Sequence, residues 1–125
     1  MAKVRLLNNS TVAIEVTALN ALTIAGGSLA GGMPGSEKII KPQPRLNAGS
    51  ISWQVPADSG ASYVLIVAVP PLAGTPPNGH QVRRSVSQSG GGQMLPPASV
   101  NPRLSKLSKK FPNGHFRLIE LIDLV

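Results

Sequence analysis

The stretch Tyr63-Val64-Leu65-Ile66-Val67-Ala68-Val69 decides the fold class of this chain. Its only polar group is the tyrosine hydroxyl, and β-branched side chains, which favour extended backbone, occupy four of its seven positions. Gly60 precedes the run and Pro70-Pro71 ends it, so it is short for a helix. The pattern predicts a strand that is buried on both faces, at the centre of a β domain.

Outside this run, alternating apolar and polar residues predict further strands. We expect them at residues 3–7, 12–18, 37–41, 50–55, 81–87 and 115–125. Asn8-Asn9-Ser10 predicts a tight hairpin between the first two, and the turn residues 56–60 predict a central hairpin joining 50–55 to 63–69. The expected fold is all-β: one domain over residues 1–125, an antiparallel β-sandwich or jelly-roll-like barrel with long Gly/Pro-rich loops.

Three segments interrupt the strand pattern. Residues 25–36 contain five glycines and no charge, and we expect a loop there, ordered either by its own domain or by a neighbouring chain. Residues 70–102 are rich in proline and glycine and are expected to form an extended arm. From residue 102 to 111, an Asn-Pro start and apolar residues at positions 104, 107 and 111 predict a short basic helix.

Charge is distributed unevenly along the chain. The net charge is +7, and no acidic residue occurs between positions 59 and 119. The bases in that interval are Arg83, Arg84, Arg103, Lys106, Lys109, Lys110 and Arg117. This asymmetry predicts an anionic partner, which could be nucleic acid, lipid headgroups or an acidic protein surface. The seven bases are the candidate contact residues.

The sequence contains few residues or motifs that would indicate an enzyme or a metal site. There is no cysteine, which excludes disulfides and thiolate metal sites. The sequence has no nucleophile elbow, no metal-binding helix motif and no phosphate-loop ending. We therefore expect a protein that is not an enzyme and that needs no cofactor or metal.

A tetrapeptide occurs twice, as Pro77-Asn78-Gly79-His80 and as Pro112-Asn113-Gly114-His115. Two histidine-bearing loops could form a joint site. The simpler interpretation is that one turn sequence is used twice, because Asn-Gly is a strong turn signal.

The chain begins Met-Ala-Lys-Val-Arg and enters a strand pattern directly, which predicts no signal peptide. No window has the 18 or so apolar residues needed to cross a bilayer. These features predict a protein made in the cytoplasm without stable membrane insertion.

Composition suggests a function. Charged residues make up only 14% of the chain and aromatic residues 3%, so few charges oppose association and few rings are available for stacking. We expect a structural protein of a multi-chain assembly, such as a bacteriophage capsid, decoration or tail subunit of a virion. The alternatives are a small β-sandwich module that binds an anionic glycan or lipid, and a non-specific nucleic-acid binder.

Overall fold

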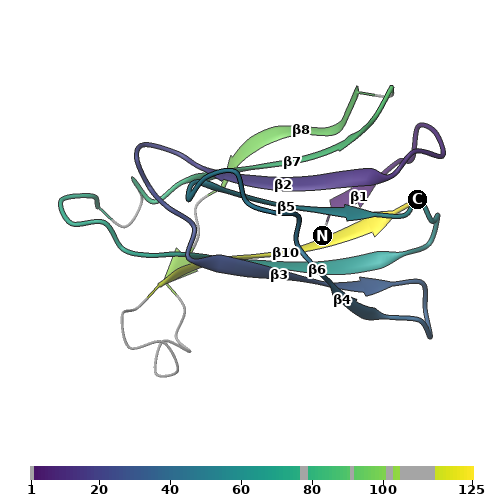
Figure 1. Cartoon of the computed structure of the whole chain (residues 1–125), viewed down its shortest axis with the longest axis horizontal. Coiled ribbons are helices and arrows are strands. Elements are labelled where there is room, and N and C mark those ends of the chain that lie inside the picture. The colour runs from purple at the N-terminus through teal and green to yellow at the C-terminus, as the bar shows by residue number, and fades with distance from the viewer. Residues whose placement is uncertain (1, 77–78, 91, 101–102, 105–114) are drawn as a thin grey trace.

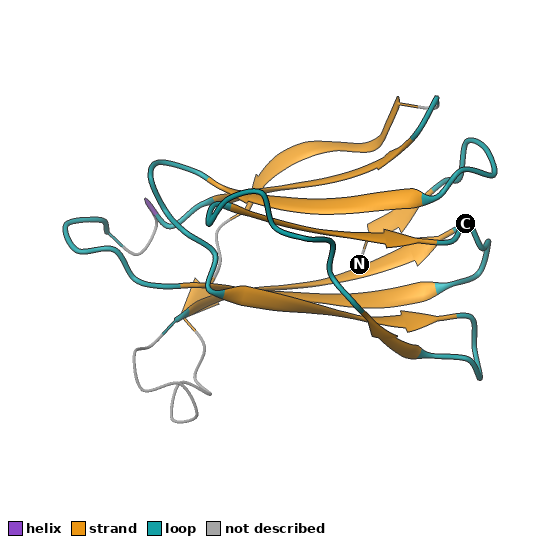
Figure 2. Cartoon of the chain, in the orientation of Figure 1, coloured by secondary structure: helices purple, strands orange, loops and turns teal. Residues whose placement is uncertain are grey.

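The computed structural model describes residues 2–76, 79–90, 92–100, 103–104 and 115–125, and it consists of two stacked β-sheets (Figure 1). Strands fill both layers and most loops lie at the ends of the sandwich (Figure 2). The described residues contain a 3₁₀ turn at Gly79 and no α-helix. The predicted all-β sandwich is confirmed.

The larger sheet, sheet A, has six strands. They are β1 (Ala2–Val4), β3 (Gly26–Gly32), β4 (Lys38–Ile40), β6 (Ser62–Val69), β9 (Arg103–Leu104) and β10 (Phe116–Leu124). Their order is β1-β10-β6-β3-β4, and β9 also pairs with β10. β1 runs parallel to β10, and the other pairings are antiparallel. The strand that decided the fold class, β6, is therefore central, between β10 and β3.

The smaller sheet, sheet B, has four strands. They are β2 (Val12–Ala18), β5 (Ser50–Val55), β7 (Val82–Gln88) and β8 (Gly92–Val100), in the order β5-β2-β7-β8, and all pairings are antiparallel. Alternate residues of β2 and β5, with Trp53 among them, point inward and are buried against the inward residues of sheet A. One apolar core thus joins the two layers.

Both predicted hairpins are wrong, because the chain changes sheet where a turn was expected. β1 belongs to sheet A and β2 to sheet B, just as β5 belongs to sheet B and β6 to sheet A. In a sandwich each sheet must cover the apolar face of the other. Two strands that follow each other in the chain can therefore lie in different sheets and still bury each other's apolar side chains.

The prediction of a loop at 25–36 is also wrong, because residues 26–32 form β3, which pairs with β6 and β4. Glycine is needed at Gly31, where φ is +148° and a Cβ atom would overlap the carbonyl oxygen of Ser62. The segment is thus ordered by strands of its own sheet. Its order gives no support to a neighbouring chain.

The predicted arm at 70–102 contains two strands of sheet B, β7 and β8, so this range is not one extended arm. The helix predicted over 102–111 is described only at Arg103–Leu104, and these residues form β9, a strand paired with β10. The rest of that range lies outside the described residues.

Candidate functional site: the outer face of sheet A

The central strand β6 is buried on one face only. Alternate residues from Tyr63 to Val69 point into the core, and the residues between them point out of the sandwich. These outward residues are Val64, Ile66 and Ala68, and Val64 is 39% exposed. The prediction of a strand buried on both faces is therefore wrong for a single copy of the chain. An apolar face is left accessible at the centre of sheet A.

Neighbouring strands extend this apolar face. On β10, Ile119 lies opposite Ile66 and Leu121 opposite Val64, and these two β10 side chains are 62% and 43% exposed. On β4, at the sheet edge, Ile39 is 81% exposed. Single exposed aliphatic residues are normal on a protein surface, but a contiguous group of this kind marks an interaction site.

On the other side of β6, strand β3 presents only small residues outward. Gly26, Ser28 and Ala30 lie opposite Ala68, Ile66 and Val64, respectively. A hollow of about 440 Å³ is lined by outward residues of β3 and β6 and ends at His115 and Arg117. A second hollow, of about 520 Å³, lies towards Glu37 and Asp123. The face is therefore apolar in its centre, and the side chains of β10 protrude from it further than those of β3.

Charged residues lie at the two ends of this face. Arg117 is outward at one end of β10, and Asp123 is at the other end, opposite Lys3 of β1. Near the Asp123 end, Glu37 accepts a hydrogen bond from the Gly35 amide at 3.1 Å. Backbone N–H groups of Glu37 itself and of Gly35 hold the pKa of the Glu37 carboxyl below its usual value. An apolar centre with a charged rim is the usual anatomy of a protein interface.

The outer face of sheet B is different. Its outward residues on β2, β5 and β7 are mostly small and polar, and sheet B is the layer at the top of the sandwich in Figure 1. They are Ala13, Glu15, Thr17, Ser50, Ser52, Gln54, Arg83, Ser85 and Ser87. A sheet with one face in water shows this pattern, so sheet A is the layer with an unusual outer surface.

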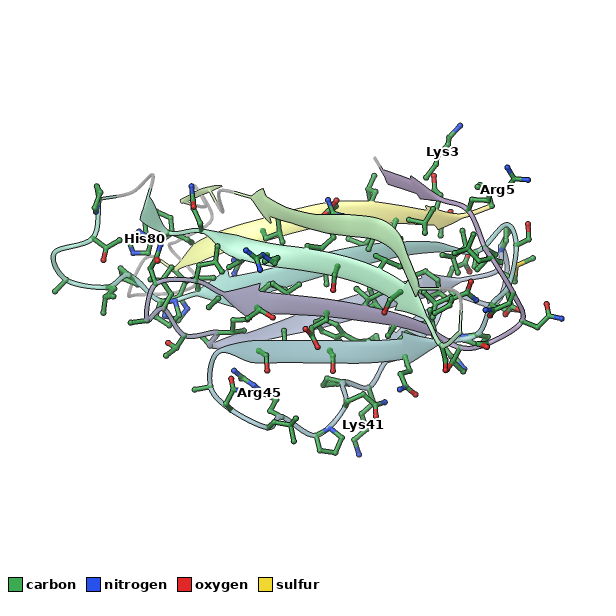
Figure 3. The ribbon with its side chains drawn as sticks, turned by 90° about the horizontal axis from the view of Figure 1, so that it is seen from above. Lys3, Arg5, Lys41, Arg45 and His80 are labelled. Carbon is green, nitrogen blue, oxygen red and sulfur yellow. The ribbon has the colours of Figure 1, made fainter. Side chains whose placement is uncertain are left out.

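The predicted basic cluster is not gathered on one surface. Arg83 is exposed on the outer face of sheet B, whereas Arg117 is on the outer face of sheet A, opposite Arg103 in register. Lys106, Lys109 and Lys110 lie outside the described residues. Lys3 and Arg5 lie at one end of the sandwich and Lys41 and Arg45 along one side, so these bases are also dispersed (Figure 3).

Arg84 was predicted as a surface contact, but its side chain is buried between the sheets. Its Nε donates to Oε2 of Glu120 at 2.9 Å, and the two side chains are only 8% and 16% exposed. Strand alternation explains the difference, because adjacent residues of β7 must point to opposite faces. Arg84 therefore binds a carboxylate of its own chain rather than an external anion.

The two histidines lie on different sides of sheet A. His80 is buried and stacks on Phe116, with ring centroids 4.1 Å apart. Its Nε2 accepts a hydrogen bond from the Leu72 amide, and its Nδ1 lies 3.0 Å from the Pro76 carbonyl oxygen. His115 instead lines the hollow on the outer face. His80 thus has a structural role in the loop that follows β6.

Within the part of the chain that the structure describes, no three His, Asp or Glu side chains are grouped as metal ligands would be. No helix in the same part is long and apolar enough to cross a membrane. No protein-family model, curated protein or solved structure matches this chain.

Sequence reasoning missed the residues that form this surface. The signal was present in two runs, 63–69 and 118–125, which carry apolar residues at both odd and even positions. Such runs predict burial on both faces. They do not indicate whether the second face of the strand is covered by the same chain or by another molecule.

Proposed function

We propose that this protein is a non-enzymatic structural subunit, which packs against neighbouring chains of an assembly through the outer face of sheet A. The observation that carries the proposal is the group of exposed aliphatic side chains on that face: Ile39, Val64, Ile119 and Leu121. Covering apolar surface is favourable by about 25 cal/mol per Å². The polar outer face of sheet B offers no comparable gain.

Among assemblies, we propose a virion, with this chain as a bacteriophage capsid, decoration or tail subunit. This choice rests on analogy of fold, because two-sheet β domains recur in viral capsids. The net charge of +7 supports it as well, since a basic chain suits contact with packaged nucleic acid or with an acidic neighbouring subunit.

The non-enzymatic part of the proposal is supported by the way titratable groups are used. His80 holds a loop through both ring nitrogens, and Glu120 holds Arg84 inside the sandwich. The outer face itself presents aliphatic and small side chains, which suit packing rather than bond chemistry.

Light scattering coupled to size-exclusion chromatography tests the proposal. We expect the wild-type chain to self-associate in a concentration-dependent manner. Ile119→Lys would place an unpaired charge in the apolar contact, and we expect it to weaken association by about 100-fold or more. Ser85→Lys is the matched control, because Ser85 is outward on sheet B, in the polar face.

The proposal would be wrong if the wild-type chain stayed monomeric at the highest concentration it tolerates. It would also be wrong if Ile119→Lys and Ser85→Lys changed association equally. Unfolding by denaturant, followed by the fluorescence of Trp53, shows whether each variant is folded, because Trp53 is fully buried and is the only tryptophan.

A further inference from the structure

The outer face of sheet A has a ridge on one side of β6 and a trough on the other. The ridge consists of Ile119 and Leu121 on β10, which are 62% and 43% exposed. The trough lies over Gly26, Ser28 and Ala30 on β3, and the hollow of about 440 Å³ opens above the first two of these. Both features belong to the same continuous surface.

The ridge and the trough are in register. Ile119 and Ser28 both lie opposite Ile66, and Leu121 and Ala30 both lie opposite Val64. Neighbouring strands are about 4.8 Å apart, so the ridge and the trough flank β6 at equal distances. A half-turn about an axis that lies over β6 and runs along it therefore exchanges their positions.

We propose that a second copy of this chain covers the outer face of sheet A about that axis, so that the ridge of each copy enters the trough of the other. The proposal rests on the proposed function and specifies its contact. Ile119 of one copy would pack on Ser28 of the second copy, and Leu121 on Ala30. A two-fold contact of this kind uses one patch twice and closes on itself.

The nature of the face favours a second copy over a lipid surface. Proteins that sit in a membrane interface use Trp and Tyr there, whereas the outward residues of β3, β6 and β10 include no aromatic residue. Two sheets pack face to face at about 10 Å with their mean strand directions within about 30° of each other. An apolar, nearly flat sheet face fits another such face better than it fits a headgroup layer.

The size of the face is suitable for a dimer. β3, β6 and β10 have 7, 8 and 9 residues, which makes the face roughly 25 Å long, and the sheet is roughly 20 Å wide. Side-chain relief increases the accessible area beyond this outline. The result is of the order of the 800 Å² or so that each partner contributes to a standard interface.

A second two-fold arrangement exists, with its axis across the strands, and shape disfavours it. That axis places β10 on β10 and β3 on β3, so the two ridges collide and the two troughs face each other with a void between them. Poorly filled contacts of this kind lose packing energy. The axis along β6 instead fills each trough with the ridge of the other copy.

Cysteine cross-linking distinguishes the two axes, and the chain has no cysteine of its own to interfere. Chains carrying Ile119→Cys and chains carrying Ser28→Cys, one of them tagged to differ in mass, are mixed, allowed to exchange and treated with a short bismaleimide. We expect a covalent heterodimer in at least fivefold excess over the product from Ile119→Cys mixed with Leu121→Cys. A mixture of Ile119→Cys and Ser52→Cys, with Ser52 on the opposite face, sets the background.

The proposal is overturned if the mixture of Ile119→Cys and Leu121→Cys cross-links better than the mixture of Ile119→Cys and Ser28→Cys. It is also overturned if light scattering shows an oligomer that Ile119→Lys disrupts but the cross-linked yield of neither pair exceeds the background. The assembly proposal survives that result. If light scattering shows no oligomer, the proposed function itself fails.

Filling the trough is an independent test. Ser28→Leu should weaken self-association at least tenfold, because the added side chain occupies the space that the ridge of the second copy would enter. Ser52→Leu, the same change on the outer face of sheet B, should leave association unchanged. Equal association of the two variants, both shown to be folded by Trp53 fluorescence, would contradict the ridge-in-trough contact.

Discussion

At the scale of single residues, two adjacent glycines in β3 have different roles. At Gly27 an added Cβ atom would point towards sheet B, where it would lie 2.8 Å from the Ile66 carbonyl oxygen and 3.1 Å from Cη2 of Trp53. Gly26 faces outward, and a Cβ atom there would meet nothing within 4 Å. The bare backbone at Gly27 lets the indole of one sheet approach the other closely.

Gly27→Ala should therefore reduce the free energy of unfolding by roughly 1–3 kcal/mol, because the methyl group forces the Trp53 ring or β6 to move. Gly26→Ala is the matched control and should be neutral or slightly stabilising, since alanine restricts the unfolded chain more than glycine does. Denaturant unfolding followed by Trp53 fluorescence measures both. Similar values for the two variants would show that Trp53 does not need the space at Gly27.

Tyr63 is a core residue of β6, and its phenol makes the stability of the fold depend on pH in the alkaline range. Burial raises the pKa of its phenol above the ordinary value of 10.0, and the negative charge of Asp58 adds to the effect. The folded chain thus disfavours the phenolate. The resulting stability is present below about pH 10 and is lost as the pH rises through the folded-state pKa.

Tyr63→Phe should remove this part of the alkaline loss, so the variant should be less sensitive to pH above about 10 than the wild-type chain. Tyr63 is the only tyrosine, so the ultraviolet absorbance of phenolate reports its titration directly. Titration at the ordinary value in the folded chain would contradict the expectation.

At the scale of elements, side chains rather than tight turns hold the passages between the sheets. Gln88, at the end of β7, is buried, and its Oε1 accepts a hydrogen bond from the Leu7 amide at 2.8 Å. Its Nε2 donates to the carbonyls of Asn8 and Ser10 at 3.0 and 2.7 Å. In the same way, Arg45 donates to three backbone carbonyls, those of Ile24, Ala48 and Ser50.

Gln88→Leu should lower the free energy of unfolding by about 1–3 kcal/mol, because the part-buried backbone groups of the passage from β1 to β2 would lose their side-chain partners. Hydrogen exchange at the Leu7 amide should accelerate as well. Gln54→Leu is the control, since Gln54 is exposed on β5, and its effect should stay within about 0.5 kcal/mol. Equal effects of the two substitutions would argue against a role for Gln88 in holding this passage.

At the scale of the whole molecule, the two sheets are joined by the ion pair of Arg84 and Glu120 as well as by the apolar core. Among the described residues, Nη1 of Arg84 is buried with no hydrogen-bond partner. A buried pair of this kind contributes little net stability, yet removal of one member leaves an uncompensated charge.

Arg84→Met and Glu120→Leu should each cost about 3 kcal/mol or more when made singly. The double variant should recover most of that loss, since it replaces the pair by apolar groups of similar size. A double-mutant cycle of unfolding free energies measures the coupling. Strictly additive losses would show that the two side chains do not interact in solution.

Local sequence predicted the elements whose side chains alternate. The bounds expected for residues 12–18 and 50–55 are those of β2 and β5, because Val12, Ile14 and Trp53 face the core between polar neighbours. Strand β3 was missed, since glycine carries no side chain from which a period could be seen. It is a strand because β6 and β4 supply its hydrogen-bonding partners.

The amino-acid sequence by itself determined that this is a β protein with an aliphatic core, and it marked β6 and β10 as strands with apolar residues on both faces. Alternation is a local property, so it can be read from neighbouring positions. Only the tertiary structure decided which strands share a sheet, that Arg84 turns inward, and that the described residues leave the outer face of sheet A uncovered. These outcomes depend on contacts between residues far apart in the chain, and the energy of covering an apolar face is the same whichever segment or molecule covers it.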